Sequence, residues 1–189
     1  MSQAGELRNV LICHPRLRSA AVQRIDATVR RTAAGTLELT FRLYGDLSQI
    51  RVPGSTEPAR ADFLWQHTCF EAFIGAGNTT AYHELNLSPS GEWAIYEFRD
   101  YREIAALGSD GMAPHIAVHT APGQLELEAK IASLPEALQA APWRVGLCAV
   151  IEEVNGSLSY WSLRHAAGPP DFHHAEAFAL VLEPPRPST

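Results

Sequence analysis

Apolar residues along this chain alternate with polar ones or gather in short runs, and turn residues separate these runs at short intervals. Such spacing is typical of β-strands in a sandwich or barrel, whereas the 3.6-residue period of a helix appears only in brief pieces. The pattern predicts about eleven strands, at residues 21–31, 36–45, 50–53, 68–74, 80–88, 92–100, 114–120, 124–132, 143–153, 158–164 and 178–183. We therefore expect an all-β fold, a two-sheet antiparallel β-sandwich, with one or two short helices at 134–141 and 101–107.

Most of the predicted strands are joined by short turn sequences such as GAGNTT, SPSGE, APGQ and VNGS, in which Gly or Asn supplies positive φ angles. Two connections are longer, PGSTEPARAD at 53–62 and HAAGPPDFHHAEA at 165–177, and both adjoin aromatic residues and histidines. Long loops in a compact β-domain frequently carry function. These two loops are therefore the first places to look for a site.

Length and composition favour one globular domain. A chain of 189 residues with 46% apolar residues can fill a single core. We expect one domain over residues 1–189, with an ordered core at about 7–183 and a flexible tail at 184–189. The net charge of −6 and the scattered arginines, with Lys130 as the one lysine, make a nucleic-acid partner improbable.

The amino end lacks the pattern of a secretory signal, and no stretch reaches the roughly 20 apolar residues of a membrane span. We expect no membrane association and a cytoplasmic location. The three cysteines, Cys13, Cys69 and Cys148, form neither a CxxC pair nor an even framework, which suits reduced, mostly buried thiols.

Two neighbouring predicted strands place acidic side chains on one face. Side chains two apart in a strand share a face, so Glu84 and Asn86 of YHELNLS point together, and Glu71 points with Cys69 and Phe73. If the register allows, Glu71, Glu84 and Asn86 converge on one concave patch. Alternatively, Glu71 forms a structural ion pair with an arginine, with Arg42, Arg99 and Arg164 as the candidates.

Three segments resemble the DOMON-like superfamily of β-sandwich ligand-binding domains, and in particular family 9 carbohydrate-binding modules. In WQHTCFEAFI, Trp65 precedes Glu71 by six residues, as in that family; YHELNLS matches the next strand; and PDFHHAEAFALVL matches the loop before the last strand. The resemblance covers about residues 20–183. It implies a β-sandwich whose motifs are more specific for the fold than for a ligand, because the superfamily includes both sugar and haem binders.

The resemblance implies an aromatic clamp, with Trp65 and Phe172 on either side of a slot and Glu71, Glu84 and Asn86 bonding what lies between them. Sugar rings suit such slots, because their C–H faces pack on aromatic planes while carboxylates and amides satisfy the hydroxyls. The sequence departs from the family where Phe172 replaces Trp, where Thr68 stands at a commonly acidic position, and where Glu84 occupies a position that can hold a base.

The third departure brings two carboxylates together without a fixed cation. Such a pair shares a proton, recruits a metal or favours a positively charged ligand. Histidines near the same proposed mouth could supply positive charge or metal ligands, although their spacing is a weak metal signature. These are His67, His165, His173 and His174.

The leading hypothesis is a non-catalytic domain that binds a carbohydrate or similar small polar ligand, with no cofactor expected. Its predicted ligand-binding residues are Trp65, His67, Glu71, Glu84, Asn86, Phe172 and His173. One alternative is a haem-binding domain, since some DOMON relatives hold b-type haem with Met and His ligands; the candidate ligands are Met112 with His115 or with a histidine of PDFHH. Another is a metal-dependent enzyme in which a histidine, Glu71 and Glu84 hold a divalent cation or act as acid and base.

Overall fold

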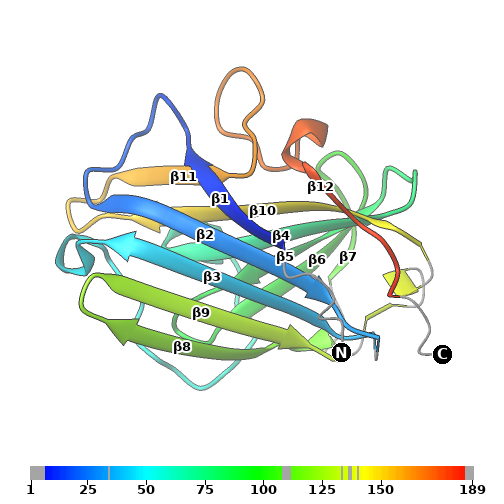
Figure 1. Cartoon of the computed structure of the whole chain (residues 1–189), viewed down its shortest axis with the longest axis horizontal. Coiled ribbons are helices and arrows are strands. Elements are labelled where there is room, and N and C mark those ends of the chain that lie inside the picture. Colours follow the sequence, from blue (N-terminus) through cyan, green and yellow to red (C-terminus); the bar gives the residue numbers. More distant parts are fainter. Residues whose placement is uncertain are drawn as a thin grey trace.

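The computed structural model describes residues 7–33, 35–107, 112–132, 134–135, 138–139 and 141–185. Over these residues it is an all-β sandwich of twelve antiparallel strands in two layers (Figure 1). The first layer contains β1 (Leu7–Cys13), β2 (Val22–Arg31), β3 (Leu37–Gly45), β9 (Gln124–Ile131) and β8 (His115–Ala121). The second contains β7 (Glu103–Leu107), β6 (Trp93–Asp100), β5 (Tyr82–Leu87), β4 (Cys69–Ala76), β10 (Trp143–Glu152) and β11 (Leu158–Ser162), with β12 (Leu180–Leu182) also paired to β10.

The main core lies between the layers and follows from strand alternation. Along β3, buried residues alternate with half-buried ones, so its Leu and Phe residues face inward. Phe41 of the first layer stacks on Phe70 of the second, with ring centroids 5.1 Å apart. Trp93, Trp143 and Trp161 also belong to this core, as expected for tryptophans in alternating strands.

Strand β4 differs because it is buried on both faces. Phe70, Ala72 and Ile74 face the main core. Phe73 faces the other way and belongs to a second apolar cluster on the outer side of the second layer. The outer face of this sheet is therefore also covered, and the two long connections, 53–62 and 165–177, form that cover.

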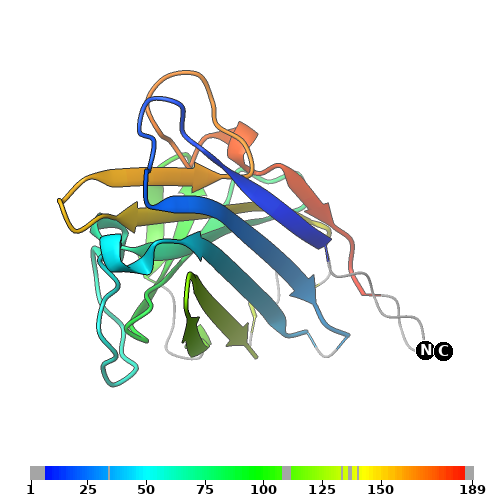
Figure 2. The same ribbon diagram turned by 60° about the vertical axis from the view of Figure 1, so that its left-hand side comes forward.

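β1 links the two layers. Its residues Leu7–Leu11 pair with β2, while Ile12 and Cys13 pair with β11. The loop after β1 lies beside the segment that follows β11, where the rings of His14 and His165 meet at 4.9 Å. Figure 2 shows these two segments, blue and orange, side by side above the sheets.

Three details differ from the sequence prediction. Residues 50–53 are not a strand; Ile50 makes only an isolated bridge to Glu153, and Pro53 has no N–H to continue a ladder. Residues 103–107 are strand β7, not a helix. Strand β1 was not predicted. The expected helix at 134–141 falls partly outside the described residues; within it Leu138 and Gln139 are helical.

The short 3₁₀ turns are η1 (Leu47–Gln49), η2 (Leu64–Gln66) and η4 (Ala175–Ala177). The end of the predicted tail, 186–189, lies outside the described residues. Among the helices of the described chain, none has the length and apolar character needed to span a membrane.

Candidate functional site

The outer face of the second layer holds the candidate site. In the register of β4 and β5, Glu71 lies opposite Asn86 and Phe73 lies opposite Glu84. The face continues into β6, where Tyr96 lies opposite Glu84, and into β10, where Cys148 lies opposite Glu71. The pairing therefore places Glu71, Glu84 and Asn86 on one face of the sheet.

A cavity of about 430 Å³ opens over this face, within the range of small-molecule sites. Half of its fourteen lining residues are aromatic: Phe63, Trp65, Phe73, Tyr96, Phe98, Tyr160 and Phe172. Its polar lining consists of Glu71, Glu84, Arg102 and His173, and Ile104, Val150 and Pro170 complete it. The cavity thus combines apolar walls with a few convergent polar groups.

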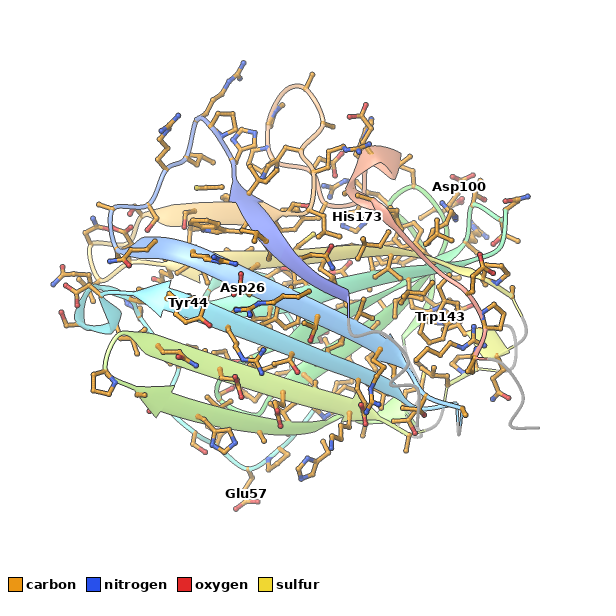
Figure 3. All side chains as sticks on the ribbon, in the orientation of Figure 1. Asp26, Tyr44, Glu57, Asp100, Trp143 and His173 are labelled. Carbon is orange, nitrogen blue, oxygen red and sulfur yellow. The ribbon has the colours of Figure 1, made fainter. Side chains whose placement is uncertain are left out.

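The long connection between β11 and β12 forms one wall. Phe172 packs against Phe73 and Tyr160, with centroids 6.4 Å and 6.0 Å away, and only 8% of Phe172 is exposed. The same segment places His173 5.2 Å from the ring of Phe73. In Figure 3, His173 lies by this segment at the level of the second layer, while Asp26 and Tyr44 lie over β2 and β3 of the first layer.

The other long connection forms the rim. Phe63, which is 62% exposed, and Trp65 of η2, which is 45% exposed, follow directly after residues 53–62. Phe63 has a left-handed backbone conformation (φ 64°), unusual for a bulky residue, and its ring meets Trp65 edge-on at 6.4 Å. A strained residue next to a cavity suits a binding role for this turn.

Glu71 is the most unusual group of the site. It is only 3% exposed, and within the described part of the chain its Oε1 has no hydrogen-bond partner. Burial, and then the nearby Glu84, hold the pKa of Glu71 well above its usual range. Two of the three arginines considered as partners are paired elsewhere, Arg42 with Glu126 and Arg99 with Glu103. Glu71 instead lines the cavity.

Glu84 is better satisfied than Glu71. Its Oε1 accepts a hydrogen bond from Nδ2 of Asn86 at 2.7 Å, and its Oε2 lies 3.6 Å from Nε2 of His173. Burial raises the pKa of Glu84, although the bond from Asn86 and the charge of Arg102 oppose that shift. Both carboxyls therefore hold a proton more readily than exposed glutamates do.

His173 is held by a short chain of hydrogen bonds. The hydroxyl of Tyr82 accepts from the backbone N–H of Arg102 at 3.0 Å and is hydrogen-bonded to Nδ1 of His173 at 2.8 Å. Burial, and then the charge of Arg102, lower the pKa of His173 to about 4. The imidazole is therefore neutral at neutral pH and adds no positive charge beside Glu84.

Replacing Tyr82 with phenylalanine should lower the free energy of unfolding by about 1–3 kcal/mol, because the Arg102 N–H and His173 Nδ1 lose their partner. Urea denaturation would measure this. Tyr101→Phe is the matched control, since it removes an exposed hydroxyl that donates to Asp171 at 2.7 Å. An equal loss in both variants would contradict the role assigned to Tyr82.

Five of the seven predicted site residues line the cavity: Trp65, Glu71, Glu84, Phe172 and His173. The other two lie outside its lining. Asn86 is fully buried beside Glu84, two residues along β5, and donates a hydrogen bond that orients it. His67 lies 2.8 Å from Glu152, a carboxylate that also accepts from Arg51. His67 therefore belongs to a polar cluster outside the cavity.

The other histidines have local roles. His165 Nε2 donates to the carbonyl of Ile12 at 2.7 Å, and His174 Nδ1 accepts from the N–H of Glu176 at the start of η4. Across the described residues there is no group of three or more His, Cys, Asp or Glu side chains able to hold a metal ion. Met112, the candidate haem ligand, is buried in the main core.

The sequence interpretation overlooked several cavity-lining residues that strand alternation could have identified. Tyr96 and Phe98 share a face of β6 two residues apart, next to the strand of Glu84. Tyr160 occupies the face of β11 opposite to that of Trp161. By contrast, no sequence pattern marks Phe63 or Arg102, which reach the cavity from turns with positive φ.

The sequence matches no protein-family model and no curated protein. Its structure is similar to a candidate carbohydrate-binding protein from Bacteroides uniformis, with a TM-score of 0.63 and 13% identity over 91% of this chain and 84% of that one. It is also similar to a family 9 carbohydrate-binding module from Caldicellulosiruptor kristjanssonii, solved with glucose, with a TM-score of 0.54 and 12% identity over 97% and 86% of the two chains. At such identities these likenesses establish the shared sandwich fold.

Proposed function

We propose that this chain is a non-catalytic binding domain that holds a carbohydrate or a similar polar ligand in the cavity above β4 and β5. The observation that carries the proposal is the combination of aromatic walls with the buried, incompletely bonded Glu71. Aromatic planes suit the C–H faces of sugar rings, and buried carboxyls suit their hydroxyls. The structural likeness to a module solved with glucose supports the same class of ligand.

In this proposal Trp65 is the exposed half of an aromatic clamp, and Phe172 is the half fixed by packing. Phe172 is held by Phe73 and Tyr160, so it requires little ordering when a ligand arrives. Trp65 covers the ligand from the rim. Glu71 and Glu84 bond the hydroxyls, and Asn86 keeps Glu84 in place.

Tryptophan fluorescence is a selective test, because three of the four tryptophans are buried in the main core while Trp65 is 45% exposed at the cavity. Millimolar monosaccharides and disaccharides should therefore change the emission of Trp65. In Trp65→Ala, calorimetry should find affinity reduced at least tenfold, whereas Tyr44→Ala, on the first layer, should bind normally. If no saccharide binds the unaltered protein, the proposed function is wrong.

A further inference from the structure

The cavity carries an imbalance of charge that a neutral sugar would leave uncompensated. Glu71 and Glu84 are close enough to influence one another, and both side chains are buried. Arg102 is the guanidinium among the lining residues, and it is already paired with Asp171 at 2.9 Å. His173 is neutral at neutral pH. Even when the two glutamates share one proton, the pair retains a negative charge.

The unpartnered oxygen of Glu71 indicates which chemical group of a ligand would bind at this position. Oε1 of Glu71 is buried without a partner among the described residues, and a buried acceptor in this state is destabilising until a donor reaches it. A hydroxyl would supply one hydrogen bond and no charge. A protonated amine supplies three donors together with the charge that the carboxyl pair lacks.

The walls favour the same group. Phe73, Tyr96 and Tyr160 line the cavity together with the two glutamates. The face of an aromatic ring attracts a cation within about 6 Å, and this attraction strengthens where water is excluded. A cationic group above Glu71 would therefore gain both from the carboxylates and from the surrounding rings.

We propose that the ligand carries a protonated amine, placed between Glu71 and Glu84, on a ring packed by the aromatic walls, as in an amino sugar. This inference rests on the proposed function for the ring and deepens it by naming the group that the acidic floor selects. A neutral sugar and an N-acetylated sugar, which lack the charge, should bind much more weakly.

Four probes separate these ideas: glucosamine, glucose, N-acetylglucosamine and cyclohexylamine, titrated calorimetrically at about pH 6, where aliphatic amines are cationic. We expect glucosamine to bind at least tenfold more tightly than glucose or N-acetylglucosamine. In Glu71→Gln, which keeps the shape and removes the ionisable carboxyl, the loss of affinity for glucosamine should be at least tenfold larger than the loss for glucose. Glu128→Gln, on β9 of the first layer, removes the same charge far from the cavity and should change neither.

The outcomes distinguish the two proposals. Equal binding of glucose and glucosamine, or a preference that persists in Glu71→Gln, overturns the amine inference and leaves carbohydrate binding standing. Binding of cyclohexylamine alone, abolished in Glu71→Gln, supports the amine inference and overturns the carbohydrate. If none of the four probes binds to a protein that circular dichroism shows to be folded, both proposals are wrong.

Discussion

Replacing Phe73 with alanine should lower the free energy of unfolding by about 3–5 kcal/mol and abolish ligand binding. Phe73 is 1% exposed, and its ring meets those of Tyr82, Phe172 and Phe178. Deleting it opens a void under the cavity and removes the support of Phe172, which is one wall of the site. Chemical denaturation and calorimetry would measure the two losses.

Phe63→Ala is the matched control, because it deletes the same side chain from the exposed rim of the same cavity. Its stability should stay within about 0.5 kcal/mol of the unaltered protein. If Phe73→Ala cost no more than Phe63→Ala, the outer cluster would not be the packed support described above.

Replacing Glu71 with glutamine should raise the stability of the protein at neutral pH by roughly 1–3 kcal/mol, since each unit by which folding raises a pKa costs about 1.4 kcal/mol and glutamine does not titrate. The physical reason is linkage. Burial raises the pKa of Glu71 in the folded state, so the folded protein holds a proton that the unfolded chain releases above about pH 4.3. The stability of the unaltered protein therefore falls as pH rises from about 4.3 to the higher pKa that Glu71 has in the folded state.

The glutamine variant lacks this titration, so its stability should decline less over the same pH range, and the two curves should converge in acid. Denaturation at a series of pH values would show this. Glu128→Gln serves again as the control for loss of a surface charge. Parallel curves for the Glu71 variant and the unaltered protein would contradict the assignment. Other titratable or charged groups lie around the pair: Cys69, Tyr82, Tyr96, Arg102, Cys148, Tyr160 and His173. Glu71 raises the pKa values of Cys69, Cys148 and Tyr160, but these groups titrate in alkaline solution, so the two curves are compared between about pH 4 and pH 7.

Alternation was sufficient to predict most of the sandwich, because the strands that bury one face carry a strict period of two, as β3 does. It failed where that period is absent. In β1, Val10 and Ile12 are apolar yet about half exposed, on the face opposite to that of buried Leu11, so burial alternates along the strand while the apolar sequence does not. In β7, Ala and Leu favour helix locally, but pairing with β6 across the turn at Arg102 overrides that preference.

The site was predictable to the extent that it lies on regular strands. Glu71 and Glu84 were found because parity and adjacency place them on one face. His67 was misplaced because it follows η2, where backbone direction changes and a period of two no longer applies; its ring instead meets Glu152. For Asn86, parity gave the correct side of the sheet but not its complete burial outside the cavity lining, which packing determines.

The strand that links the layers also affects how the molecule loses its structure. Because β1 is hydrogen-bonded to β2 along most of its length and to β11 at its end, the two sheets cannot separate without breaking one of these sets of bonds. Opening of one sheet is therefore coupled to opening of the other. The binding face and the opposite layer should melt in a single cooperative transition, so a ligand held on one sheet protects the whole domain.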